Sequence, residues 1–397
     1  MLGNYKFVID TFSEIYQNLT PPVRNKLPWA NGQPFQIDKT YWDFAREEIE
    51  PNTIYVVGRE QAHINAEKIR HILDNGTARI IYSSPSEGSQ TLIGHTRHAG
   101  LEPYLLNGKM LAIGGGGMGS EYNHMFYDHF LPKIYDYPQN VTECNRTEEV
   151  FYKLEKPYNF LFLNGRTRPH RRWLLHYCRN NALLDKCLWT NLDSHVGYSR
   201  SLPYENETLC NLQDPLPVQS LPAHYEVSKF HKNIKDSYNQ SFIKYELFNI
   251  NGQVEWGDAY INAQCYIDTY FSLVTETVFD YPHSFRTEKI WKPIAMGHPW
   301  IAVANSGFYK DLQDLGFKTF GTIIDESFDQ ETDSVARIRK IANLVSDLCS
   351  SQTRLRQFLV DSYEICMYNK ELLRRLRHQV RERFADDFVN AVTRWTT

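Results

Sequence analysis

Short apolar segments alternate with amphipathic ones along this chain, and the alternation occurs in two successive series. In the first series, apolar and β-branched runs at 53–57 and 79–83 flank a stretch with helical periodicity at 60–74. The second series begins with an apolar run at 159–163 and continues with helical spacing over 171–184. Strands that alternate with helices favour parallel sheets covered by helices. The sequence therefore predicts an α/β protein.

The remaining patterns extend both series and add a helical tail. They predict a strand or hairpin within 104–113, a helix over 121–135, strands at 187–190, 263–267 and 271–275, a helix over 307–315 and a strand at 317–324. From 334 to about 395 the chain lacks proline and is predicted to be almost wholly helical. Residues 138–150 are polar without apolar periodicity, which predicts a linker, and 191–240 are predicted to form long loops.

The length of 397 residues exceeds the size at which one hydrophobic core usually stops growing, so we expect two domains. Their predicted limits are 1–150 and 151–345, both Rossmann-like, and 346–397 is predicted to form a helical tail that packs back on the first domain. The net charge of −4 predicts no general attraction to nucleic acid. No apolar run approaches the ~20 residues that span a bilayer. We expect a cytoplasmic protein, associated at most peripherally with the inner face of a membrane.

The segment that says most about a possible binding site is residues 271–304, FSLVTETVFDYPHSFRTEKIWKPIAMGHPWIAVA. An apolar strand precedes Glu276, and a polar loop then leads to Arg286 and to Glu288 and Lys289 at the start of a short helix. Ligands of parallel α/β sheets bind at the carboxyl ends of strands, beside helix amino ends. Cations suit phosphate and carboxylates suit hydroxyls, so the pattern indicates a site for a phosphorylated sugar. The alternative is an ordinary solvated helix start.

This segment resembles the donor-binding signature of GT-B glycosyltransferases, especially α-1,3-fucosyltransferases, in which a Thr-Glu-Lys sequence starts a helix. The resemblance implies a GT-B fold, with two Rossmann-like domains that face a cleft and a nucleotide-sugar donor bound by the second domain. His298-Pro299 is similar to the His-Pro pair of CMP-sugar transferases, and adds bacterial β-Kdo transferases as a second family. The implied donor is a GDP-sugar such as GDP-fucose, or CMP-Kdo. The implied acceptor is a glycan or lipid-linked glycan, in the synthesis of a bacterial surface polysaccharide such as lipopolysaccharide.

A second basic cluster lies in residues 160–175, FLFLNGRTRPHRRWLL, where an apolar strand leads into a helix. Arginine is a bidentate phosphate donor, and the free N–H groups of a helix start add positive potential. We therefore expect Arg166, Arg168 and His170 to bind the donor together with Arg286, Glu288, Lys289 and His298. Arg172 is expected to be solvated.

The catalytic group is left open among Glu276, Glu121, His124, Asp258 and Asp236. His124 and Asp128 lie four positions apart on the predicted helix 121–135, which permits an acid–base pair, metal ligation or a surface hydrogen bond. The sequence contains no Asp-x-Asp pair to hold a divalent ion. We therefore expect a metal-independent transferase with no cofactor beyond the nucleotide sugar.

Two other functions compete with a transferase. Gly114, Gly116 and Gly119 match the G-x-G-x-x-G spacing of dinucleotide-binding loops, which would indicate an NAD(P)-dependent oxidoreductase. A non-catalytic carbohydrate-binding or assembly protein could also retain the fold. Binding of nucleotides distinguishes both alternatives from a transferase.

Overall fold

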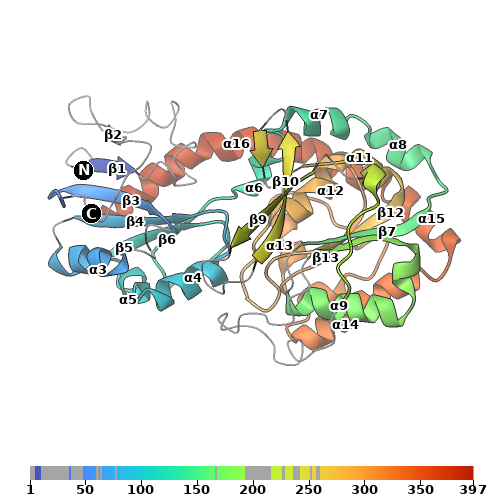
Figure 1. Cartoon of the computed structure of the whole chain (residues 1–397), viewed down its shortest axis with the longest axis horizontal. Helices are drawn as coiled ribbons and strands as arrows, with labels where there is room; N and C mark the ends of the chain where they lie inside the picture. The colour runs from blue at the N-terminus through green and yellow to red at the C-terminus, as the bar shows by residue number, and fades with distance from the viewer. Residues whose placement is uncertain are drawn as a thin grey trace.

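The computed structural model is an α/β protein with parallel sheets and a long C-terminal helix (Figure 1). It describes residues 5–9, 35–36, 48–59, 62, 65–76, 78–165, 168–192, 216–225, 229–235, 242–250, 253–255 and 260–396. The predicted α/β class with parallel sheets and a C-terminal helical tail is confirmed. Within these ranges no helix is both long enough and apolar enough to cross a bilayer.

The first sheet has six parallel strands in the order β2-β1-β3-β4-β5-β6. These are β1 (Lys6–Ile9), β2 (Phe35–Gln36), β3 (Thr53–Gly58), β4 (Arg79–Ser84), β5 (Met110–Gly114) and β6 (His124–Phe126). In β3, Tyr55 and Val57 belong to one buried cluster, and Ile54 and Val56 belong to another. Successive strand residues face opposite sides, so this sheet is buried on both faces.

The second sheet has four parallel strands in the order β13-β12-β7-β8. These are β7 (Tyr158–Asn164), β8 (Cys187–Asn191), β12 (Thr269–Thr275) and β13 (Trp300–Val303). Every residue of β12 is buried, as expected for a central parallel strand. A separate antiparallel sheet is formed by β9 (Lys229–Lys235), β10 (Phe242–Ile250) and β11 (Gln253–Glu255).

The helices lie between and after these strands. They are α3 (Ala66–Asn75), α4 (Ser89–His98), α5 (Glu102–Leu106), α6 (Phe130–Lys133), α7 (Pro138–Cys144), α8 (Thr147–Tyr152), α9 (Pro169–Asn180), α11 (Ala263–Ile267), α12 (Glu288–Met296), α13 (Phe308–Asp314), α14 (Ser334–Leu348), α15 (Gln352–Asp361) and α16 (Tyr363–Thr396). Short 3-10 turns occur at η3 (Leu183–Lys186), η4 (Ala223–Tyr225) and η5 (Ser327–Gln330).

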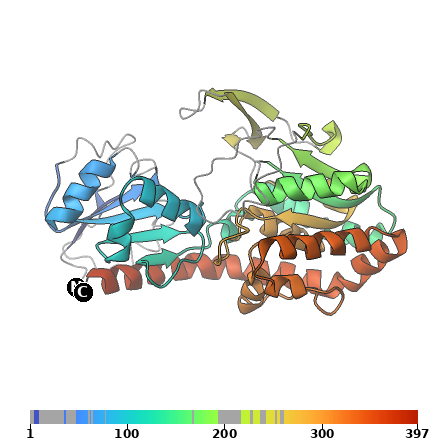
Figure 2. The ribbon, with the colours of Figure 1, turned by 90° about the horizontal axis from the view of Figure 1, so that it is seen from below.

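Helix α16 is continuous over 34 residues and packs on both parts of the core. Leu373 is buried in the cluster that includes the second sheet. Phe384 and Phe388 pack against the β3 face that bears Ile54 and Val56. Figure 2 shows α16 running along the molecule beneath both sheets.

Most predicted elements are present with shifted boundaries. The strands predicted at 53–57, 79–83, 159–163, 187–190 and 271–275 correspond to β3, β4, β7, β8 and β12, and the helices at 60–74, 171–184 and 307–315 to α3, α9 and α13. The tail predicted as helical from 334 comprises α14, α15 and α16.

Two predicted strands are wrong. Residues 263–267 form α11, because the Asn262 side chain accepts a hydrogen bond from the backbone of its first turn and caps it. Residues 317–324 form no strand. There the Glu326 carboxylate accepts a 2.7 Å hydrogen bond from Phe320 N, which stabilises a turn in place of a sheet.

The strand or hairpin predicted within 104–113 is present as the single strand β5, which follows helix α5. The helix predicted over 121–135 is wrong, because the short elements β6 and α6 take its place. The β6 strand pairs with β5 because Ala112 N donates to Asn123 O at 3.0 Å. Met125 is then buried in the same cluster as α16. Tertiary pairing therefore overrides the helical periodicity of this segment.

The polar stretch 138–150 contains helices α7 and α8 instead of a linker without regular structure. Although this segment is polar, one of its side chains is buried and holds it against the neighbouring segments. The Asn140 side chain donates to Ile134 O at 2.6 Å and accepts from Ile261 N at 2.9 Å. A buried amide with both ends satisfied stabilises this segment without apolar periodicity.

Candidate functional site at the carboxyl edge of the second sheet

The second sheet has a topological switch point between β7 and β12. From β7 the chain continues to β8 on one side, and later to β12 and β13 on the other side. Ligands of open parallel sheets bind outside the carboxyl ends of the strands at such a point. Helix α9 follows β7 and α12 follows β12, so both helices begin at this edge.

Every strand of this sheet ends at, or is closely followed by, a buried amide or carboxylate. These residues and their exposed fractions are Asn164 (2%), Asn191 (4%), Glu276 (0%) and Asn305 (3%). Burial of polar groups costs free energy unless they are hydrogen-bonded. Their occurrence at one edge of an apolar sheet makes that edge the candidate site. Of the four, the sequence analysis named only Glu276 as a site residue.

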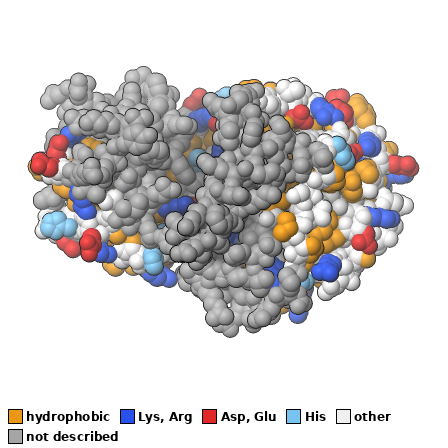
Figure 3. Space-filling model, in the orientation of Figure 1, with side chains coloured by type: hydrophobic (Ala, Val, Ile, Leu, Met, Phe, Trp, Pro, Cys, Tyr) orange, Lys and Arg blue, Asp and Glu red, His pale blue; other side chains and the backbone are white. Residues whose placement is uncertain are grey.

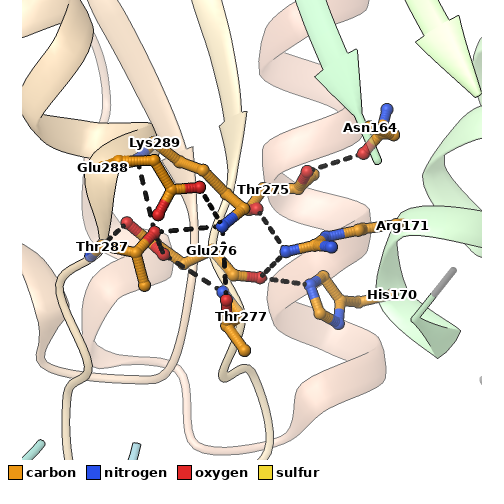
Figure 4. Close-up of polar contacts among 9 residues, drawn as sticks. All are labelled: Asn164, His170, Arg171, Thr275, Glu276, Thr277, Thr287, Glu288 and Lys289. Carbon is orange, nitrogen blue, oxygen red and sulfur yellow. Dashed lines mark hydrogen bonds and ion pairs between the residues drawn. The ribbon is translucent and has the colours of Figure 1, made fainter. Parts of the chain in front are cut away.

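The Glu276 carboxylate stabilises the amino end of α12 (Figure 4). One oxygen accepts from Thr287 N at 3.1 Å, and the other accepts from Thr287 Oγ1 at 2.7 Å and Thr277 N at 3.1 Å. Thr287 in turn caps the helix by accepting from Lys289 N at 3.3 Å. Both oxygens of Glu276 are thus occupied by the protein. Its role is to position Thr287 rather than to contact a ligand.

Glu288 and Lys289 lie at the start of α12 and are partly exposed. Lys289 Nζ lies 2.7 Å from Glu288 Oε1, 3.2 Å from Thr287 Oγ1 and 3.4 Å from Thr277 Oγ1. The side chains of Glu288 and Lys289 are 12% and 23% exposed. The structure therefore places an accessible cation and an accessible carboxylate beside a helix amino end.

The amino end of α9 meets the same edge from the other side. His170 Nε2 donates to Glu276 O at 2.8 Å, and Arg171 donates to Thr275 O and Glu276 O at 3.0 and 3.1 Å. Arg168 is the residue that precedes the first turn. His170 and Arg171 are buried and fix the two helix starts relative to each other. Arg172, expected to be solvated, is also buried.

Burial controls the charge of the groups between these helices. It raises the pKa of Glu276, although Lys289 opposes the rise. Burial also lowers the pKa of His170 well below its ordinary value, and neighbouring Arg171 adds to the effect. The imidazole is therefore neutral and donates its Nε2 hydrogen to a carbonyl. His170 is a positioning residue here, not a phosphate ligand.

Arg286 does not face the switch point. Its guanidinium pairs with Asp128 at 2.9 Å and with Asp311, and lies 5.1 Å from the centre of the Phe126 ring. Only about 6% of the Arg286 side chain is exposed. The expected donor contact is therefore replaced by a buried ion pair that joins the β6–α6 loop to the loop before α12. His124 and Asp128 share no helix, so their predicted i,i+4 pairing does not occur.

The glycine-rich loop Gly114–Gly119 contacts the loop before α12. Gly116 forms a backbone bridge with Phe285. A Cβ added at Gly115 would overlap Pro85 O and approach Phe285 Cε2 to 2.8 Å. Close backbone packing accounts for Gly115 and Gly116 without a bound dinucleotide.

The other predicted site residues lie apart from the switch point or outside the described residues. Glu121 is exposed in the loop before β6, and His124 is on β6. His298 is buried near the amino end of β12, where its ring lies 2.9 Å from both Ser272 Oγ and Thr269 O. Three further candidates lie outside the described ranges, namely Arg166, Asp236 and Asp258.

Comparison of the chain with protein-family models, with curated proteins and with solved structures found no match. Among the residues with described positions, no three His, Cys, Asp or Glu side chains are grouped so as to hold a metal ion.

Proposed function

We propose that this protein is a metal-independent glycosyltransferase that binds a nucleotide sugar at the carboxyl edge of the second sheet. The observation that carries the proposal is the meeting of the amino ends of α9 and α12 at one switch point, with Lys289 and Glu288 partly exposed there. Two helix starts and an ammonium favour a diphosphate. The Glu288 carboxylate would accept hydrogen bonds from ribose or sugar hydroxyls.

A GT-B arrangement agrees with the contact between the two sheets. The loops at their carboxyl edges meet where Gly116 pairs with Phe285. In that arrangement the first sheet carries the acceptor side, and the product is a bacterial surface glycan. The Thr287-Glu288-Lys289 sequence favours a GDP-sugar such as GDP-fucose. His298, which suggested CMP-Kdo, lies near the other end of β12 and contributes nothing to this site.

Transfer without a metal requires that protein groups stabilise the charge of the departing nucleotide. Preorganised charges and dipoles are usually the largest catalytic contribution of a protein. Here Lys289 and the amino ends of α9 and α12 would supply them. Activity should therefore persist in EDTA.

Thermal-shift measurements with GDP, CMP, UDP and NAD, each with and without EDTA, test the proposal. GDP should stabilise the protein, and EDTA should not remove the effect. Lys289→Ala should weaken GDP binding about tenfold or more, since it removes a charge-assisted hydrogen bond. Lys310→Ala is the matched control, because that lysine side chain is 71% exposed and lies on α13.

Three outcomes would contradict the proposal in distinct ways. Stabilisation by NAD alone would favour the oxidoreductase. Binding of sugars without any nucleotide would indicate a non-catalytic carbohydrate-binding protein. A transfer activity lost in EDTA and restored by Mn²⁺ would refute metal independence.

A further inference from the structure

The side chain of Asn164 has an unused hydrogen-bond donor inside the protein. Asn164 is the last residue of β7 and is 2% exposed. Its Oδ1 accepts from Thr275 Oγ1 at 2.8 Å, but its Nδ2 has no partner among the residues that the structure describes. An unpaired buried donor is destabilising, so native structures retain few of them without a reason.

The other two amides at the same edge differ in this respect. Asn191, at the end of β8, donates from Nδ2 to Pro217 O at 2.9 Å. Asn305, after β13, donates from Nδ2 to Ser306 O at 2.9 Å. The unused donor of Asn164 is therefore not a general consequence of placing an amide at this edge.

Thr275 places this donor at the switch point. The Thr275 hydroxyl binds Asn164, and the Thr275 carbonyl accepts from Arg171 in the first turn of α9. Figure 4 shows the amide nitrogen of Asn164 on the side of the group that faces away from Thr275. The orientation of the amide at the end of β7 is thus fixed by the Thr275 hydroxyl.

We propose that Asn164 Nδ2 donates a hydrogen bond to a phosphoryl oxygen of the nucleotide-sugar diphosphate. This inference rests on the proposed function and adds a ligand-contacting residue to it. A phosphoryl oxygen fits because it only accepts hydrogen bonds, and because the neighbouring helix start favours negative charge. Thr275 is the positioning residue that fixes the orientation of the amide.

Calorimetric titration of the full chain with GDP and with inorganic pyrophosphate tests the proposal. Asn164→Ala and Asn164→Asp should each weaken both ligands about tenfold or more, because each removes the donor. Asn191→Ala, the matched control at the neighbouring strand, should bind both ligands as the wild type does. Thr275→Val should weaken binding, and Thr275→Ser should restore it.

The outcomes separate this inference from the proposed function. Loss of binding in Lys289→Ala together with unchanged binding in both Asn164 variants would overturn the role of Asn164 and leave the proposed function intact. A wild-type protein that binds neither ligand would overturn both. If Asn164→Ala does not fold, the titration of Asn164→Asp tests the proposal instead, because an aspartate at this position can still accept the Thr275 hydrogen bond.

Discussion

Burial has a larger effect on the charge of Lys156 than any single neighbour does. The Nζ donates to Val150 O at 2.8 Å and to Ile267 O at 2.7 Å, in the last turns of α8 and α11. Burial lowers the pKa of this lysine to about 7, the cation of Lys153 adds to the fall, and Asp268 opposes it. A lysine that is half-charged near neutrality links protein stability to pH.

The unfolded chain keeps the Lys156 proton up to its ordinary pKa, whereas the folded chain releases it above about 7. The unfolded state thus binds more protons above pH 7, and stability should rise with pH there, by about 2 kcal/mol between pH 7 and 9. Lys156→Met should lack this rise in urea unfolding, and Lys310→Met, at an exposed lysine, should keep it. Equal slopes in wild type and Lys156→Met would contradict the assignment.

At the scale of the element, α12 depends on a cap that is anchored by a distant strand. Thr287 caps the helix and also donates to the buried Glu276 carboxylate. The same short segment carries Glu288 and Lys289. The geometry of the proposed donor site is therefore set by how firmly this helix start is held.

Removal of the Thr287 hydroxyl should loosen that helix start. Thr287→Ala loses the cap, worth about 1 kcal/mol, and leaves a buried carboxylate oxygen with one partner fewer, worth about 1–3 kcal/mol. We expect a loss of about 2–4 kcal/mol in chemical denaturation. Thr287→Ser retains the hydroxyl and should recover most of it. If the serine variant is as unstable as the alanine variant, the hydroxyl is not what stabilises α12.

At the scale of the whole molecule, α16 and contacts between loops join the sheets. Helix α16 packs on both sheets, and the glycine-rich loop contacts the loop before α12. On the face seen in Figure 3, positive and negative side chains are interspersed over the described surface. The contact between the loops also sets the distance between the two carboxyl edges, which a transferase would use to bring donor and acceptor together.

Gly115 and Gly117 offer a matched test of that contact. A Cβ at Gly115 would overlap Pro85 O, a backbone atom that cannot rotate away, whereas a Cβ at Gly117 would lie 3.4 Å from His283 Cβ, an ordinary contact. Gly115→Ala should cost about 3 kcal/mol or more, and Gly117→Ala should be nearly neutral. Thermal unfolding measures both. Similar melting temperatures for the two variants would show that the loops are not closely packed.

The sequence by itself determined the strands, helix ends and caps, because these depend on residues that are close together along the chain. Apolar runs predicted β3 and β7 because a buried parallel strand must be apolar on both faces. Gly76, Gly297 and Gly316 end their helices at positive φ, a conformation that favours glycine. The cluster at the start of α12 was found in this way, since a cap and its charges lie within three residues.

Only the tertiary structure decided what the buried polar groups do. Arg286 and its partner Asp128 are 158 positions apart, and Asn164 and Thr275 are 111 apart. No local pattern encodes such pairs, because the value of a buried charge or amide depends on which distant group satisfies it. The sequence located the edge of the sheet where chemistry is expected. Folding decided that Arg286 joins two loops through an ion pair, that Glu276 supports that edge, and that the Asn164 donor there has no partner within the described part of the chain.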